Sequence, residues 1–155
     1  MRTLWRISKH TDLIGLGGEK SSGRWHTKER GKRIVYLSEH PALALIETLA
    51  NLKGDSRLFP ENYQLMKVTA PDKVAPFVVP PDVLIADWKE FIPATQFAGD
   101  TWLRSRLRAL MAVPSVPAPE STNYLFNPLH PHASKFTIEW VKEFQYDRRL
   151  FTIRT

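Results

Sequence analysis

The chain has 155 residues, of which 43% are hydrophobic and 11% aromatic. This length supports one domain with a buried core and is too short for two. The chain contains no cysteine, which excludes disulfides, thiol nucleophiles and thiolate metal sites. Because the sequence has neither an apolar run of about 20 residues nor a signal-like start, we expect a cytoplasmic protein without a membrane span.

The net charge of +6 is concentrated at the start of the chain. Residues 1–33 contain nine lysines and arginines and three acids, whereas residues 34–155 contain thirteen of each. A basic surface attracts anionic ligands, and the charge alone does not choose between a nucleic acid, a dinucleotide and an acidic protein. A solvated basic face without any ligand explains the same charge.

The first half of the chain predicts strands, a long loop and one helix. Alternation of apolar and polar residues predicts strands over residues 2–8, 34–37 and 63–69. The polar, glycine-bearing stretch 9–31 indicates an ordered loop. Residues 41–52 are rich in strong helix formers, with Pro41 in the first turn, and predict a helix.

The second half begins with a proline-rich stretch over residues 71–93. Each proline fixes φ and removes a backbone donor, so this stretch is expected to be largely irregular. A second helix is predicted over residues 99–110, with its cap near Asp100. Its apolar face would consist of Leu103, Leu107 and Leu110.

The end of the chain predicts further short strands, over residues 111–116, 123–126 and 136–144. Strands outnumber helices and do not alternate with them, as they would in repeated βαβ units. We therefore expect an α+β fold, a single mixed and mainly antiparallel domain over residues 1–155.

Familiar nucleotide and metal motifs are missing from the sequence. Gly15-Leu16-Gly17-Gly18 has neither the Lys-Ser/Thr of a P-loop nor the spacing of the dinucleotide fingerprint, so a tight turn is expected there. The five histidines have no cysteine partners, and His130-Pro131-His132 is stiffened by its proline. We therefore expect no metal site.

Four side chains suit chemistry on a phosphate-bearing ligand: a cation, an aromatic ring, a carboxylate and a hydroxyl, supplied by Arg24, Tyr36, Glu47 and Ser115. Glu47 lies with Thr48 and Asn51 in a narrow polar stripe of the first helix. Each residue also has an ordinary explanation, such as an exposed cation, a core tyrosine or the solvent edge of a helix. Nothing in the sequence places a base beside Ser115.

Several blocks in a fixed order resemble the RES-domain toxins, which are named for an Arg, a Glu and a Ser. They are Leu4-Trp-Arg-Ile-Ser-Lys, the segment from Gly23 to Leu49, Val-Pro-Ser at 113–115 and Asn-Tyr-Leu-Phe-Asn-Pro at 123–128. The resemblance covers nearly the whole chain and is weakest across the proline-rich middle. It identifies a single RES domain over residues 1–155.

This resemblance implies a fold like that of ADP-ribosyltransferases and consumption of NAD by hydrolysis or phosphorolysis of the nicotinamide bond. It implies Glu47, Arg24 and Tyr36 as catalytic residues, with Glu47 as the catalytic carboxylate. It also implies that Arg6, Arg24, Tyr36 and Ser115 bind NAD. Relatives often have Asn where this chain has His26, so the role of that position stays open.

The resemblance implies an Xre-type antitoxin as the protein partner. Nucleic acid would be contacted only indirectly, through this antitoxin. The oligomeric state stays open. Some RES toxins ADP-ribosylate a protein, so transfer to a protein stays an alternative to NAD degradation. A basic RNA-targeting toxin and a non-enzymatic interaction module also stay open, although no RNA-binding signature is present.

Overall fold

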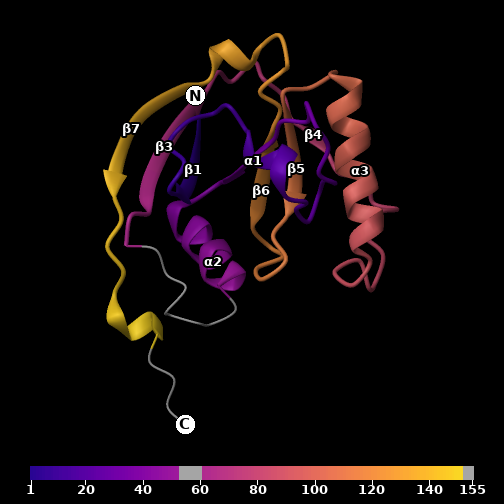
Figure 1. Ribbon diagram of the computed structural model, residues 1–155. Coiled ribbons are helices and arrows are strands. Elements are labelled where there is room, and N and C mark those ends of the chain that lie inside the picture. Colours follow the sequence, from indigo (N-terminus) through magenta and orange to yellow (C-terminus); the bar gives the residue numbers. More distant parts are fainter. Residues whose placement is uncertain (53–60, 152–155) are drawn as a thin grey trace.

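A computed structural model describes residues 1–52 and 61–151 (Figure 1). Its centre is a seven-stranded sheet with the order β4-β5-β6-β2-β1-β3-β7. Only β4 and β5 are parallel, and every other neighbouring pair of these strands is antiparallel. The predicted α+β class with a mainly antiparallel sheet is therefore confirmed. In the described part of the chain, no helix has the length and apolar character needed to cross a bilayer.

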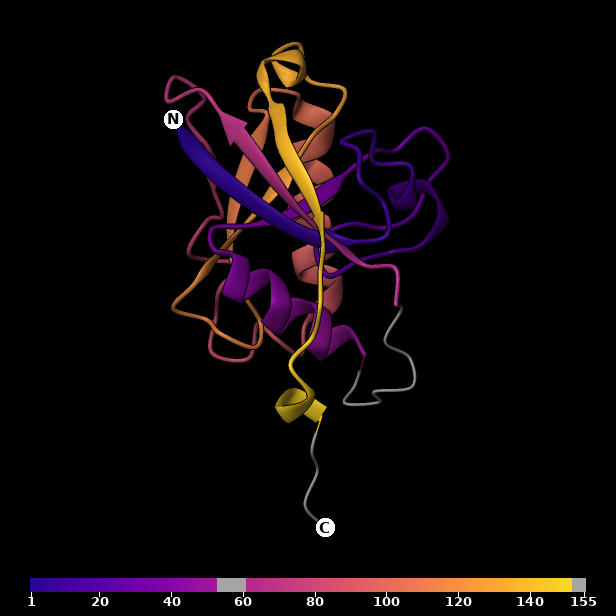
Figure 2. The same cartoon turned by 90° about the vertical axis from the view of Figure 1, so that its left-hand side faces the viewer.

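The predicted strands are present with small shifts at their ends, as β1 (Arg2–Ser8), β2 (Val35–Ser38), β3 (Gln64–Ala70), β5 (Leu110–Pro114), β6 (Thr122–Phe126) and β7 (Thr137–Glu143). Figure 2 shows β1, β3 and β7 side by side at one end of the sheet. A strand that the sequence did not predict, β4 (Phe77–Val78), lies within the proline-rich stretch and pairs with β5.

The helix α2 (Pro41–Asn51) forms as predicted. His40 caps it, since its Nδ1 accepts a hydrogen bond from the backbone N–H of Ala42 at 3.1 Å. The helix packs on β1 and β2 with Leu43 and Ala44 buried beneath it. In the loop before β2, Gly15 has a φ of 75°, as the predicted tight turn requires, and the short helix α1 (Gly17–Lys20) follows.

The second helix is displaced from its predicted position. The helix α3 (Ile92–Ser105) begins inside the proline-rich stretch, because Pro93 occupies its first turn, where a missing N–H costs little. It ends at Arg106, whose φ of 53° breaks the helical path. Leu107 is therefore 79% exposed and Leu110 belongs to β5, so neither forms the predicted helical face.

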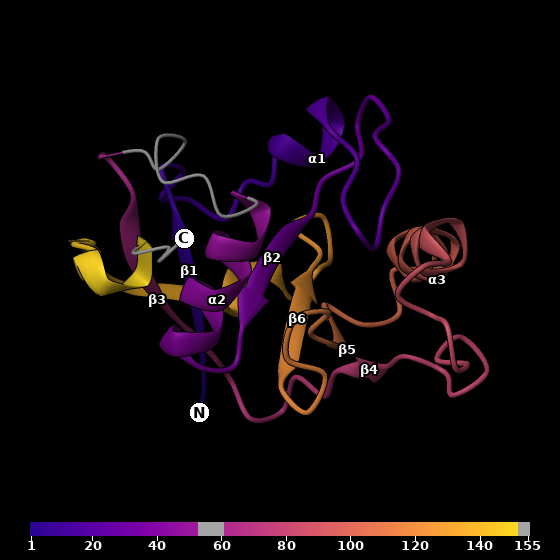
Figure 3. The same cartoon turned by 90° about the horizontal axis from the view of Figure 1, so that it is seen from below.

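The core lies on both faces of the curved sheet. One cluster is centred on β1, β2 and β3, and it includes Leu4, Val35, Leu37, Met66, Val68 and Phe126. A second cluster joins β5 and β6 to α3, and it includes Trp25, Trp102, Leu103, Met111, Val113 and Leu125. Figure 3 shows α2 over the centre of the sheet and α3 beyond its β5 and β4 end. The loop that carries Trp25 lies between these two helices.

Candidate functional site

A cavity of about 420 Å³ lies between α2 and the strands β1 and β2. This volume is within the range of small-molecule sites, about 300–1,000 Å³. Segments far apart in the sequence form its walls, and Arg6, Arg24, Tyr36 and Glu47 all line it. Four of the five predicted site residues are thus brought together in one cavity.

One face of α2 supplies the floor of this cavity. Ala44, Glu47, Thr48 and Asn51 all line it, and their spacing places them on the same side of a helix. The polar stripe seen in the sequence therefore faces a cavity rather than bulk solvent.

Two side chains hold one oxygen of the Glu47 carboxylate. The hydroxyl of Ser115 and the amide Nδ2 of Asn123 each donate to Oε1, both at 2.6 Å. The hydroxyl of Ser38 donates to Oδ1 of Asn123 at 2.8 Å, which fixes the orientation of the amide. Within the described residues no hydrogen bond reaches Oε2, so this oxygen is the one free to meet a ligand.

Ser115 lies behind Glu47 and does not line the cavity. Its side chain is fully buried, and its hydroxyl also accepts a hydrogen bond from the backbone N–H of Ala118 at 3.2 Å. No pattern in the sequence pairs it with a carboxylate, yet its place directly after β5 brings its hydroxyl to Glu47 of α2. The hydroxyl is directed at Glu47 instead of at the space where a ligand would lie.

Two arginines give the cavity a positive charge. Arg24 is half-buried and donates from Nη1 to the backbone carbonyl of Lys89. Burial lowers the pKa of the Arg6 guanidinium, against the opposing effects of Asp12 and Tyr63. Among the described residues neither arginine forms an ion pair with a carboxylate. Such cations suit an anionic ligand, because guanidinium groups bind phosphate oxygens in pairs.

His26 holds the phenol of Tyr36. The Nε2 of His26 lies 3.0 Å from the carbonyl of Ser21 and its Nδ1 lies 2.7 Å from the hydroxyl of Tyr36. Because the carbonyl can only accept, Nε2 donates to it and Nδ1 of the neutral ring accepts from the phenol. Burial lowers the pKa of His26 and raises that of Tyr36, so both groups stay uncharged near neutral pH.

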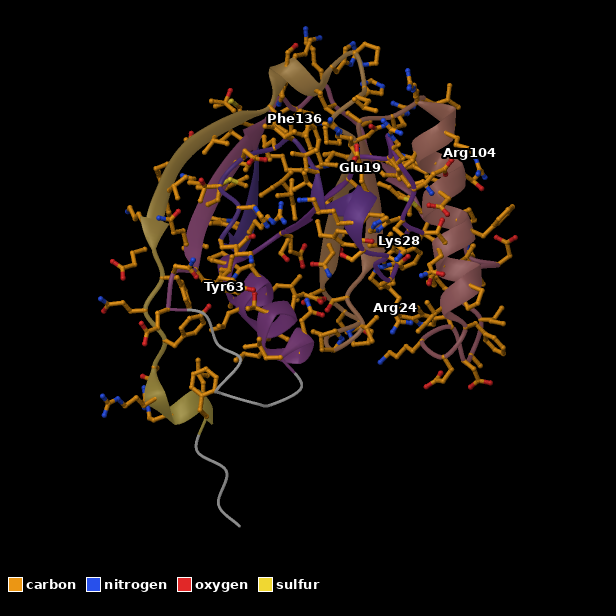
Figure 4. All side chains as sticks on the ribbon, in the orientation of Figure 1. Glu19, Arg24, Lys28, Tyr63, Arg104 and Phe136 are labelled. Carbon is orange, nitrogen blue, oxygen red and sulfur yellow. The ribbon has the colours of Figure 1, made fainter. Side chains whose placement is uncertain are left out.

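The helix α3 fixes the loop that carries Arg24. The hydroxyl of Thr95 donates to the backbone carbonyl of Arg24 at 2.7 Å, and Nε2 of Gln96 donates to the carbonyl of Gly23 at 3.0 Å. One turn further along, Gly99 lets the backbone of Trp25 approach so closely that a Cβ there would lie 1.7 Å from its carbonyl oxygen. Figure 4 shows Arg24 and Lys28 between the two longer helices.

Asp100 also joins the Arg24 loop to α3. It lies in the middle of this helix and therefore does not cap it, contrary to the prediction from the sequence. It accepts from the hydroxyl of Thr27 at 2.6 Å and from Nζ of Lys32 at 2.9 Å. Burial alone would raise the pKa of Asp100, but the hydrogen bonds from Thr27 and Lys32 outweigh it and lower the pKa below its ordinary value.

The depressed pKa predicts a stability that depends on pH. The ionised Asp100 stabilises the fold above its unfolded pKa of about 3.9, and this stabilisation is lost as the pH falls through the lower folded value. We expect acidification to lower the melting temperature of the parent more steeply than that of Asp100→Asn. Thermal unfolding between about pH 6 and pH 2.5 measures this. The exposed Asp82→Asn is the control, and equal slopes for parent and Asp100→Asn would contradict the prediction.

The structure adds residues to which the sequence assigned no role. Asn123 and Ser38 support Glu47, His26 supports Tyr36, and α3 supports the Arg24 loop. Asn123, Ser38 and His26 all lie within blocks that carry the family resemblance, which was the only signal for them. The contacts of Asn123 with Ser38 and Glu47, and those of α3 with the Arg24 loop, join segments distant in sequence, so no local pattern could reveal them.

Comparison with known proteins agrees with the resemblance. The RES domain family matches residues 3–149. Toxin Res of Pseudomonas putida KT2440 is 39% identical over 148 residues, which cover 96% of this chain and 99% of that protein. The Prs ADP-ribosylating toxin of Sphingobium sp. YBL2 is 35% identical over 159 residues, which cover 96% of each chain.

A solved structure shares the fold. One chain of the M. tuberculosis MbcT-MbcA toxin-antitoxin complex matches with a TM-score of 0.68 and 16% identity, covering 92% of this chain and 83% of that chain. Together with the ADP-ribosylating relative, this agrees with the expected ADP-ribosyltransferase-like fold. Since the family match and both relatives extend over nearly the full length, the chain belongs to the RES domain family.

Proposed function

We propose that this protein is the toxin of a toxin-antitoxin pair and that it degrades NAD by cleaving the bond between nicotinamide and ribose. The observation that carries this proposal is the cavity in which, among the described residues, Glu47 presents a carboxylate oxygen without a hydrogen bond beside two arginines without carboxylate partners. Relatives named as toxins support the assignment.

The cavity offers complementary groups for the pyrophosphate and the nicotinamide of NAD. Arg6 and Arg24 would bind the pyrophosphate, since a guanidinium pairs with two phosphate oxygens at once. The ring of Tyr36 would stack on nicotinamide while His26 holds its hydroxyl.

Glu47 would act on the ribose. Cleavage of the nicotinamide bond builds positive charge on the sugar, as in the oxocarbenium-like transition state of glycosidases. A carboxylate held in place stabilises that charge more than it stabilises the ground state, which lowers the barrier. Ser115 and Asn123 would keep Oε2 directed at the ribose by holding Oε1.

A second candidate is transfer of ADP-ribose to a protein, and the 35%-identical ADP-ribosylating relative favours it. The two reactions share the broken bond and differ in the group that attacks the sugar. The same residues serve both, so the products must distinguish them.

The test is mass spectrometry of NAD incubated with the protein in phosphate buffer, in phosphate-free buffer and with cell lysate. ADP-ribose in every buffer indicates hydrolysis, and ADP-ribose-1″-phosphate only with phosphate indicates phosphorolysis. A modified lysate protein indicates transfer. Intact NAD under all three conditions would refute the proposal.

The partner that we propose is an antitoxin of the Xre type, acting on the toxin in the cytoplasm. The structural neighbour from a toxin-antitoxin complex supports a partner of this general kind. Blocking the cavity would silence the enzyme without changing its fold, and NAD turnover of the co-purified pair tests this directly.

Arg24→Lys is expected to weaken NAD binding by roughly tenfold, because an ammonium keeps the charge but loses the paired geometry. The dissociation constant from calorimetric titration measures the effect. Arg30→Lys is the matched control, since Arg30 lies nearby in the loop and does not line the cavity. Unchanged affinity in Arg24→Lys would indicate that Arg24 is a solvated cation that does not bind NAD.

Ser115→Ala is expected to lower kcat by roughly tenfold or more with little change in KM. A hydrogen bond to a charged group contributes about 1.5–3 kcal/mol, and here it positions Glu47 rather than the substrate. Asn123→Ala should act in the same way, and the double variant should lose less than the product of the single losses. A rise in KM alone would instead place Ser115 against the ligand.

A further inference from the structure

A second hollow, of about 320 Å³, lies away from the proposed NAD cavity. It is formed by residues 29–33, the end of α3 and residues 127–129. The two hollows share no lining residue. A molecule bound in the second hollow would therefore touch none of the groups assigned to NAD.

Positive charge gathers around this hollow. Of the residues that the structure describes, five cations and one acid, Glu29, line it. Lys32 pairs with Asp100 at 2.9 Å, and Arg33 pairs with Glu19 at 3.4 Å. The other three cations, which are Arg30, Arg104 and Arg106, are exposed and have no ion pair within the residues that the structure describes.

The end of a helix explains only part of this charge. Cations favour a helix C-terminus, which accounts for Arg104 and Arg106 at the end of α3. It does not account for Arg30 and Arg33, which a separate loop brings to the same hollow. The basic excess of residues 1–33 thus meets a second basic segment, and together they make an anion-attracting surface.

An exposed leucine accompanies the cations. Leu129 lines the hollow and is 46% exposed. Apolar side chains do not contribute to the binding of a free phosphate or of a nucleic-acid backbone. Arginines beside exposed apolar groups are instead typical of protein interfaces.

We propose that this hollow docks an acidic segment of a protein partner, whose carboxylates would contact Arg30, Arg104 and Arg106 and whose aliphatic side chain would contact Leu129. The proposal goes beyond the proposed function and does not depend on it. It provides a point of attachment for a partner that leaves the NAD cavity open, so attachment and inhibition become separable.

The test uses a fluorescent peptide that repeats two glutamates followed by a leucine, with binding followed by anisotropy. R30Q/R104Q/R106Q should bind it at least roughly tenfold more weakly than the parent, because complementary charges at the interface are lost. K9Q/K73Q/K135Q removes the same number of charges from exposed lysines outside the hollow and should change binding little. Thermal unfolding of both triple variants checks the fold, and the single variant Arg104→Glu repeats the test if the triple variant is unstable.

A second peptide with serine in place of leucine should bind more weakly to the parent, which reports on the apolar contact with Leu129. Equal loss in the two triple variants would overturn the proposal, since only overall charge would then matter. Equal affinity of the two peptides, or tighter binding of an RNA oligomer that depends on Arg104, would overturn the protein assignment. Because no readout involves NAD, these outcomes are independent of the enzymatic proposal.

Discussion

Glu47→Gln is expected to lower the rate of nicotinamide release by at least about a hundredfold, with the fold intact. The carbonyl oxygen of a glutamine can accept the two hydrogen bonds that Oε1 now accepts from Ser115 and Asn123. The amide NH₂ would then replace Oε2, so the variant keeps the shape of the site and loses the charge. The loss therefore isolates the electrostatic effect on the developing positive sugar.

The measurement is nicotinamide release by purified parent and variant, with circular dichroism and thermal unfolding as checks on the fold. Glu120→Gln, at an exposed position outside the cavity, is the matched control for removing one carboxylate. Turnover like that of the parent in Glu47→Gln would refute the catalytic role. Loss of turnover together with a lower melting temperature would assign Glu47 to stability instead.

The sequence predicted elements well where the signal was local. Strands predicted from alternating apolar and polar residues, such as β3, and the helix α2 with its strong helix formers were identified close to their observed bounds. The helix α3 was displaced because two local rules failed there. Pro93 begins a helix rather than preventing one, and Gly99 lies in the middle of a helix because close packing against Trp25 requires it.

The site likewise has residues that the sequence could indicate and a contact that depends on tertiary packing. The family resemblance identified Arg6, Arg24, Tyr36 and Glu47, which line one cavity. It also implied Ser115 as an NAD-binding residue, and in the structure the hydroxyl of Ser115 donates to Glu47. This pairing depends on how β5 packs near α2, which no periodicity or spacing encodes.

The attachment of the Arg24 loop to α3 makes Gly99 the position where a small substitution should have the largest effect on stability. A Cβ at this position would lie 1.7 Å from the carbonyl oxygen of Trp25 and 2.7 Å from its carbonyl carbon. Both are backbone atoms, so no side-chain rotation relieves the clash and the helix and loop must separate. Overpacking typically costs about 1–3 kcal/mol, and the rigidity of both partners places Gly99→Ala at about 3 kcal/mol or above.

Separation would also weaken the hydrogen bonds that Thr95, Gln96 and Asp100 make to the loop. Since that loop carries Arg24, NAD binding should also weaken. The decrease in the free energy of unfolding is measured by urea denaturation followed by tryptophan fluorescence. Gly17→Ala is the matched control, because a Cβ at Gly17 meets no atom within 4 Å. If Gly99→Ala unfolds at the same urea concentration as Gly17→Ala, the loop is not held by this contact. The position of Arg24 would then have to depend on hydrogen bonds alone, namely those that join it to Lys89 and to Thr95.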